Sequence, residues 1–183
     1  MKTANKKLNK LTYITYQVFP NEKANTIQTI RMLESMNAYK IDVKLIFPDR
    51  ESSNQELNDI KKFYQVKQDF KILKLPHKLP FNRIHMKKFE KFNFLISSFI
   101  WSYKTIKNYS KSITDREIIM TRTHWILYFA SAFANIVVYE CHKFSKIDNF
   151  IFKKLSEKNN VVVVFSNEAL RKEFKVSNII LKN

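Results

Sequence analysis

Hydrophobic and polar residues alternate in short blocks along the chain, and these blocks predict strands and helices that follow one another in turn. Residues 11–36 predict a buried strand, a polar loop and an amphipathic helix. The strand is rich in β-branched and aromatic residues, and Pro20 and Asn21 are predicted to end it. Asn25 or Thr26 is predicted to cap the helix, because either side chain can accept from a free N–H of the first turn. The apolar face of this helix is predicted to consist of Ile27, Ile30, Leu33 and Met36.

The same alternation continues to the end of the chain. Further strands are predicted at residues 41–47, 70–75, 117–121, 136–139 and 161–166. Further helices are predicted at residues 54–64, 124–134, 147–158 and 168–174. Pro48 and Pro76 are predicted to end the second and third strands, the latter opening a stiff loop over residues 76–80. The fold class is therefore α/β, a Rossmann-like parallel sheet with helices on both faces, formed by residues 11–183 after a basic flexible tail at residues 1–10.

One segment, residues 81–111, combines a predicted helix with many aromatic residues and lysines. Its uncharged stretch, residues 92–103, is shorter than the roughly 20 apolar residues that cross a bilayer. It could lie in a membrane interface, with lysines toward the headgroups and aromatic rings toward the acyl chains. In the alternative, the aromatic residues pack on the sheet and the lysines are solvated. We favour the second explanation, because the apolar residues are too numerous for none to be core.

The chain contains no glycine in 183 residues. Turns that need a positive φ are therefore expected at Asn or Asp, the next most tolerant residues. The absence of glycine also excludes phosphate-binding loops that glycine defines, including the dinucleotide fingerprint and the P-loop.

The net charge of +17 has two explanations, a nucleic-acid or membrane partner, or a composition rich in lysine throughout. Lysines are spread along the chain and greatly outnumber arginines, which base-reading sites prefer, so specific nucleic-acid binding is not expected. Attraction to anionic lipid is expected. A single cysteine, Cys141, excludes an internal disulfide and a cysteine-based metal site. No apolar segment follows the basic N-terminus, so we expect a cytoplasmic protein, with a peripheral place on the inner face of the membrane as a further option.

Four segments in order over nearly the whole chain resemble glycosyltransferase family 4. The first loop contains Pro20, Glu22, Lys23, Ala24, Asn25, Ile27 and Gln28. The later segments are Met120-Thr121-Arg122-Thr123, Val137-Val138-Tyr139-Glu140-Cys141-His142 and Val164-Phe165-Ser166-Asn167-Glu168-Ala169-Leu170. The resemblance implies the N-terminal, acceptor-side half of a GT-B architecture.

The resemblance also implies the activity. It is retaining transfer of a sugar from a nucleotide-sugar donor to a saccharide or lipid-linked acceptor, in cell-surface polysaccharide synthesis. No metal is expected, and no cofactor beyond the nucleotide sugar as co-substrate. Residues 179–183 resemble the strand before the second, donor-binding domain, and nothing in the chain matches that domain. We therefore expect one half of an enzyme, inactive until the other half is supplied. The alternative is a non-catalytic, basic Rossmann-like module that binds anionic membrane or nucleic acid.

The resemblance places His142 at the end of the fifth strand, in contact with the transferred sugar. Glu140 lies two residues earlier, so both side chains are predicted to share one face, where the carboxylate could orient the imidazole. Arg122 ends the fourth strand and could bind a phosphate or an acidic acceptor group through its planar fork. The alternatives are a structural His and Glu for the first pair, and an ordinary ion pair for Arg122.

The first loop and the start of the first helix supply the remaining candidates. Lys23, Asn25, Thr26 and Gln28 would meet a phosphate or sugar hydroxyls, or would only cap the helix. Ser166, after the sixth strand, is a further candidate for the lining of the cleft. The remaining histidines are interpreted as structural or surface residues: His77, His85 and His124.

Overall fold

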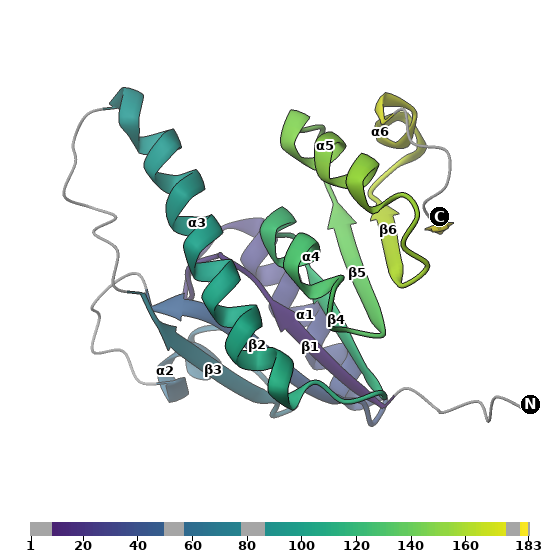
Figure 1. Cartoon of the computed structure of the whole chain (residues 1–183). Coiled ribbons are helices and arrows are strands. Elements are labelled where there is room, and N and C mark those ends of the chain that lie inside the picture. The colour runs from purple at the N-terminus through teal and green to yellow at the C-terminus, as the bar shows by residue number, and fades with distance from the viewer. Residues whose placement is uncertain (1–8, 50–56, 78–86, 175–179, 183) are drawn as a thin grey trace, which may run out of the picture.

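A computed structural model describes residues 9–49, 57–77, 87–174 and 180–182. Its seven strands form one parallel sheet in the order β3-β2-β1-β4-β5-β6-β7 (Figure 1). The strands are β1 (Lys10–Ile14), β2 (Asp42–Asp49), β3 (Lys71–Pro76), β4 (Glu117–Thr121), β5 (Ile136–Cys141), β6 (Val161–Phe165) and β7 (Ile180–Lys182). The helices are α1 (Ala24–Ala38), α2 (Leu57–Phe63), α3 (Lys87–Tyr109), α4 (His124–Ala130), α5 (Lys146–Leu155) and α6 (Glu168–Glu173), and a 3₁₀ turn, η1 (Ser110–Ser112), follows α3. The α/β, Rossmann-like fold class is thus confirmed.

The order of the strands reverses between β1 and β4, since β2 and β3 extend one way and β5, β6 and β7 the other. In open parallel sheets, the crevice outside the carboxyl ends of the strands at such a reversal is where ligands bind. The topology therefore marks the ends of β1 and β4 as the place for a site.

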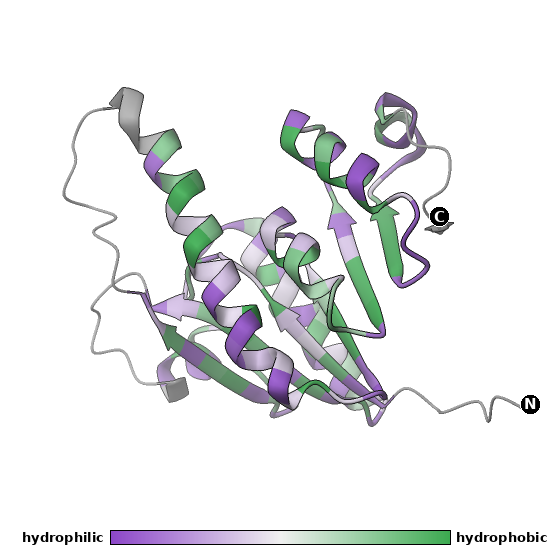
Figure 2. Ribbon diagram, viewed as in Figure 1, coloured by the Kyte–Doolittle hydropathy of each residue, from purple (hydrophilic) through white to green (hydrophobic). Residues whose placement is uncertain are grey.

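Helices cover both faces of the sheet, and each face has its own apolar core. Tyr13 of β1 points to the core that α1 and α2 cover, whereas its neighbour Ile14 points to the core under α3, α4, α5 and α6. This alternation is the period of two that a strand imposes. β6 is hydrophobic along its whole length, as expected for a strand buried between helices and neighbouring strands (Figure 2).

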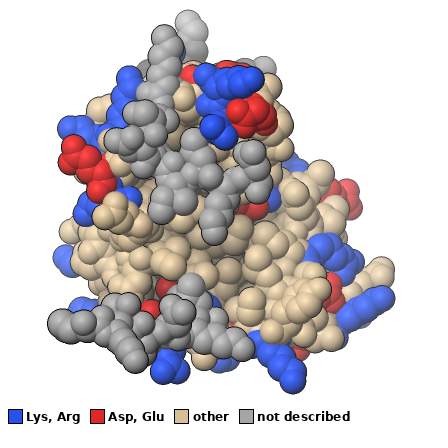
Figure 3. All heavy atoms as spheres, turned by 90° about the vertical axis from the view of Figure 1, so that its right-hand side faces the viewer, with Lys and Arg blue, Asp and Glu red and all other residues tan. Residues whose placement is uncertain are grey.

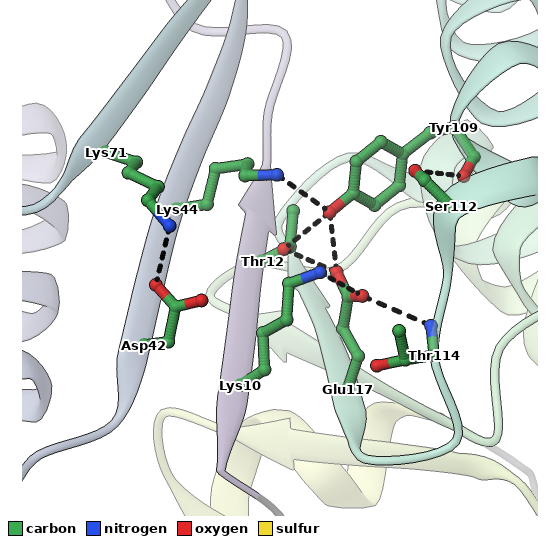
Figure 4. Close-up of polar contacts among 9 residues, drawn as sticks. All are labelled: Lys10, Thr12, Asp42, Lys44, Lys71, Tyr109, Ser112, Thr114 and Glu117. Atoms are coloured by element: carbon green, nitrogen blue, oxygen red, sulfur yellow. Dashed lines mark hydrogen bonds and ion pairs between the residues drawn. The ribbon is translucent and has the colours of Figure 1, made fainter.

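A buried carboxylate joins the amino ends of β1 and β4 to the end of α3 (Figure 4). Glu117 is fully buried, and its oxygens accept from Lys10 Nζ at 2.7 Å, Thr12 Oγ1 at 2.6 Å and the Tyr109 hydroxyl at 2.6 Å. Burial alone would raise the pKa of Glu117, but these hydrogen bonds outweigh it and hold the pKa below its usual value. We call these four residues the Glu117 cluster. It lies at the opposite end of the sheet from the crevice.

Several element boundaries differ from the sequence-based expectations. β1 begins at Lys10, which was assigned to the basic tail, and ends at Ile14, well before Pro20. Pro48 lies inside β2 and pairs with Leu75 of β3. It is tolerated because β2 pairs with β1 only as far as Ile46, so the missing N–H costs no hydrogen bond to β1.

The start of α1 also differs. Its N-cap is Lys23, which makes no side-chain capping bond, so the expectation that Asn25 or Thr26 caps the helix was wrong. Thr26 instead lies in the first turn, where its hydroxyl donates to the carbonyls of Asn21 at 2.8 Å and Lys23 at 2.7 Å. On the expected apolar face Ile30 and Leu33 are buried, and Met36 packs against the core, but Ile27 is 41% exposed.

Positive φ angles occur at Lys40 (63°) and Gln65 (50°) among the described residues, so the expectation of Asn or Asp at such positions was wrong. The Gln65 turn has the bonding pattern of a Schellman motif, with Val66 N–H donating to the Lys61 carbonyl and Gln65 N–H to the Lys62 carbonyl. These backbone bonds hold the left-handed conformation even though the residue is not glycine.

α3 agrees in part with each of the two explanations for its aromatic residues, packing on the sheet and exposure to a membrane interface. Trp101 and Ile106 are buried in the core, as the packing explanation requires. Several of its apolar side chains nevertheless remain 40–60% exposed, namely Phe92, Phe94, Ile96, Phe99 and Tyr103. Within the described part of the chain, every helix is too short or too polar to cross a bilayer. The loop expected at residues 76–80 and the start of the segment at residue 81 lie largely outside the described residues.

Candidate functional site

A cleft of about 760 Å³ opens at the carboxyl ends of β1, β4 and β5, where the strand order predicts a site. One wall comes from the chain after β1 and from the first turn of α1, and another from α3 through Phe94 and Ser98. The floor is formed by the last residues of β5 and by the residues that follow β4 and β5. Of the predicted site residues, the lining contains Asn25, Gln28, Arg122, Glu140 and His142.

Arg122 is the centre of the polar floor. Its Nε and Nη2 donate to the two oxygens of Glu140 at 2.9 and 3.3 Å, while Nη2 also donates to Gln28 Oε1 at 3.2 Å and Nη1 to the Asn25 carbonyl at 3.3 Å. A guanidinium carries five N–H donors, so one donor on Nη1 is left without an acceptor among the described residues. Arg122 and Glu140 are mostly buried, with side chains 10% and 13% exposed. The ion-pair alternative for Arg122 is therefore what the structure shows.

Glu140 serves Arg122 and not His142. The end of β4 pairs with β5 through Thr121 and Tyr139, so the next residues, Arg122 and Glu140, lie side by side. The hydroxyl of Tyr13 also donates to Glu140, at 3.1 Å. Between Glu140 and His142, both within the described residues, there is no hydrogen bond, so the expectation that this carboxylate orients the imidazole is not met. Burial and the neighbouring Glu140 carboxylate raise the pKa of Tyr13, which therefore remains a hydrogen-bond donor at neutral pH.

His142 follows the last residue of β5 and is exposed at the edge of the cleft. Partial burial and then the charge of Arg122 lower its pKa, while Glu140 acts in the opposite direction. The imidazole is therefore neutral at physiological pH, with one nitrogen that donates and one that accepts. Such a group suits a hydroxyl-bearing ligand.

The other predicted site residues do not line the cleft. Lys23 is exposed at the start of α1, and the Thr26 hydroxyl is occupied by backbone carbonyls. Ser166 follows β6, where its N–H donates to the Cys141 carbonyl at 3.0 Å and its side chain is exposed to solvent. None of the three lines the cleft, so the structure leaves Lys23, Thr26 and Ser166 outside the candidate site.

The sequence analysis missed one pair in the cleft, because His124 was interpreted as structural or surface. Its Nδ1 lies 3.2 Å from Oδ1 of Asp148, a carboxylate that is almost fully buried in the first turn of α5. Ser145 caps this helix by accepting from the Asp148 N–H, so the Ser-x-x-Asp spacing was the available signal for Asp148. Nothing in the spacing links His124 to it.

The Asp148 carboxylate also influences two side chains of β5. Burial and this negative charge raise the pKa of Tyr139, and they raise the pKa of Cys141 to about 12. Cys141 therefore stays a thiol and is not a nucleophile at neutral pH. No group of three or more His, Cys, Asp or Glu residues within the described ranges could hold a metal ion.

The charge of the site differs from that of the whole chain. Glu140 neutralises Arg122, and the imidazole of His142 is uncharged at neutral pH, so the cleft floor is polar but close to neutral. The excess of lysine lies elsewhere. On the face that Figure 3 shows, Lys and Arg side chains lie around the margin, with Asp and Glu between them, and do not form one patch. The near-neutral, polar floor favours neutral, hydroxyl-rich ligands in the cleft over phosphate groups.

No protein-family model matches the chain, and no curated protein matches it either.

Proposed function

We propose that this chain is the acceptor-side domain of a retaining glycosyltransferase, which holds a saccharide or lipid-linked acceptor while a nucleotide sugar bound to a second domain supplies the sugar. The proposal places the protein in the cytoplasm, in the synthesis of a cell-surface polysaccharide. It rests on the resemblance of the four sequence segments and on one structural observation. That observation is the cleft at the strand reversal, in which β4, β5 and α1 bring together Arg122, Glu140, Gln28 and His142.

The chemistry of the floor supports a binding and positioning role. Sugar hydroxyls both donate and accept, and the floor offers the neutral imidazole of His142 and the second Nη1 donor of Arg122, which has no acceptor among the described residues. Holding an acceptor hydroxyl beside the donor carbon converts an encounter between two molecules into a step within one complex. Stabilisation of the leaving nucleoside diphosphate falls to the donor-binding domain in this proposal.

Saccharide binding tests the cleft directly. A fluorescently labelled chain is screened on an array of cell-surface saccharides, and a bound saccharide is then titrated by calorimetry. Gln28→Ala should weaken binding about tenfold, because the change removes a hydrogen bond that fixes Arg122 and leaves a donor unpaired. Ser166→Ala is the matched control, since this residue lies outside the cleft. Equal losses in the two variants, or no saccharide bound at all, would count against the cleft.

Transfer itself is tested on the chain combined with a donor-binding domain. There, His142→Ala should reduce sugar transfer by about a hundredfold or more, as loss of a group that contacts the reacting sugar would. The far-ultraviolet circular dichroism should stay unchanged, because His142 is exposed and follows the end of β5. Near-normal transfer by this variant would refute the role of His142.

A second function, peripheral binding to an anionic membrane, is favoured by the exposed aromatic side chains of α3. Phe92 is 60% exposed and Phe99 41%, and Lys104 and Lys107 are exposed on the same helix. Aromatic rings in the acyl boundary with lysines at the headgroups is the usual arrangement of an interfacial helix.

Sedimentation with vesicles that contain an anionic phospholipid, repeated across a salt series, tests this second function. Binding should fall with salt and with Phe92→Ser, but not with Phe63→Ser, which changes another exposed ring (47%) on α2, across the sheet. Binding to RNA with the same salt slope and no response to Phe92→Ser would favour general attraction to polyanions instead.

A further inference from the structure

A second cavity, of about 540 Å³, lies beside the cleft, between the C-terminal half of α3 and strands β2 and β3. Its volume is in the range of small-molecule sites. The wall is mainly apolar, and the side chains that form it are Ile46, Leu73, Leu75, Ile100 and Trp101. We call this the α3 cavity. None of its residues belongs to the predicted site.

Two polar side chains with no partner among the described residues line the α3 cavity. Lys104 and Asn108 line it from positions four residues apart on α3, which places them on one face of the helix. Both are exposed, and neither side chain forms an ion pair or hydrogen bond with the part of the chain that the structure describes. An ammonium group above an apolar wall is complementary to an anion that carries an aliphatic chain.

Tyr16 of the cleft contacts two residues that line the α3 cavity. Its hydroxyl lies 2.6 Å from Nε2 of His77, and the centroid of its ring lies 5.6 Å from a ring centroid of Trp101. His77 and Trp101 both line the α3 cavity. The polar floor of the cleft and the α3 cavity thus lie near one another, and a ligand with a polar and an apolar part has adjacent places for both.

We propose that the α3 cavity binds the aliphatic part of an amphipathic anion, with the phosphate or carboxylate next to Lys104. If the proposed function holds, this amphiphile is the lipid part of the acceptor, and the acceptor class is therefore a lipid-linked saccharide. The cavity itself does not depend on that function. It requires only an aliphatic chain for the apolar wall and an anionic group for the ammonium.

Tryptophan fluorescence can follow binding, because the chain contains only two tryptophans and one of them, Trp101, lines the cavity. Trp125→Phe leaves Trp101 as the sole reporter. Geranyl phosphate at concentrations below micelle formation serves as the probe, with geraniol and inorganic phosphate as controls. We expect a saturable change with geranyl phosphate, weaker binding of geraniol and no change with inorganic phosphate. Saturation by inorganic phosphate alone would overturn the proposal.

Three variants assign the two parts of the ligand, with calorimetry as a second readout. Lys104→Gln should weaken geranyl phosphate binding about two- to fivefold, the size of one exposed ion pair, and leave geraniol unaffected. Lys107→Gln is the matched control, because this lysine is on the same helix but outside the cavity lining. Leu73→Thr, which places a β-branched residue with good strand propensity in the edge strand, should weaken both ligands about tenfold, the loss of roughly two methylene groups of contact with the ligand.

The outcomes separate this proposal from the proposed function. If geranyl phosphate binds but no saccharide does, the α3 cavity stands and the acceptor role falls. Saccharide binding in the cleft with no geranyl phosphate binding would remove the cavity alone. Equal effects of Lys104→Gln and Lys107→Gln, or binding to anionic vesicles but not to the monomeric probe, would assign the lipid contact to the outer surface of α3 and overturn the proposal.

Discussion

Arg122 illustrates how much a single residue depends on its neighbours. Its position after β4 was predictable, and so was its orientation to the cleft. Its state was not, because the carboxylate that neutralises it comes from another strand 18 residues later in the chain. A free arginine would attract phosphate, whereas one paired with Glu140 presents a single N–H and little net charge. Because Glu140 is paired with Arg122, it does not pair with His142.

The pairing can be tested through the titration of His142. Arg122→Gln should raise the pKa of His142, because the change removes a positive charge and leaves the Glu140 carboxylate unopposed. Glu140→Gln should lower the pKa further, since only burial and Arg122 then act on the imidazole. Proton–carbon NMR of the imidazole signals measures both shifts, with the signal assigned by its loss in His142→Ala. Shifts of the same sign in the two variants would disprove the electrostatic arrangement.

At the scale of elements, hydrophobic periodicity predicted the existence and order of the strands and helices well. β4 has the predicted bounds, and the bounds of β6 differ by a residue. The failures concern local backbone chemistry. Pro48 was expected to end β2, but a proline is excluded only where a neighbouring strand needs its N–H, and the length of β1 decides that. The prediction of the α1 cap failed because Thr26 lies inside the first turn, where its hydroxyl donates to backbone carbonyls.

The turns after α1 and α2 provide a second prediction. Gln65 adopts φ 50°, a conformation that costs a residue with a Cβ roughly 1 kcal/mol and glycine almost nothing. Gln65→Gly should therefore raise the free energy of unfolding by about 0.5–1 kcal/mol, measured by urea denaturation. Lys62→Gly, inside α2, is the control and should lower stability by about 1 kcal/mol through the poor helix propensity of glycine. A loss of stability in both variants would contradict the left-handed turn at Gln65.

At the scale of the whole molecule, the alternating pattern was sufficient to predict one parallel sheet covered on both faces. It could not predict the order of the strands, because pairing depends on long-range contacts that no local period encodes. The site followed the same division. Residues near the ends of β1, β4 and β5 were found from their place in the chain, but the His124–Asp148 pair and the α3 cavity arise only when distant elements pack together.

The Glu117 cluster makes the stability of the whole molecule depend on pH. The pKa of Glu117 is lower in the folded chain than in the unfolded chain. The Glu117 carboxylate therefore contributes its full stabilisation above the unfolded-state pKa of about 4.3, and this stabilisation is lost as the pH falls through the folded-state pKa. Glu117→Gln should cost about 2 kcal/mol at pH 7, because one oxygen becomes an amide N–H that faces donors and Lys10 loses its counter-charge.

Denaturation across pH 3 to 7 checks this prediction. The stability of Glu117→Gln should fall less steeply with acid than that of the unmodified chain. Tyr109→Phe removes one hydrogen bond to the same carboxylate and should cost about 1 kcal/mol at pH 7. Glu168→Gln, in an exposed pair with Arg171, should leave the acid slope unchanged. Parallel slopes for Glu117→Gln and the unmodified chain would remove the cluster as the acid-sensitive element.

The left-handed turns at Lys40 and Gln65 also have a spectroscopic consequence. Because the sequence contains no glycine, a glycine placed at either turn would be the only one in the molecule. Cell-free synthesis of Gln65→Gly with nitrogen-15 glycine would then give one amide signal, from the junction between α2 and β3. The spectrum of a 183-residue chain would then contain the signal of one chosen peptide group, and no resonance assignment would be needed.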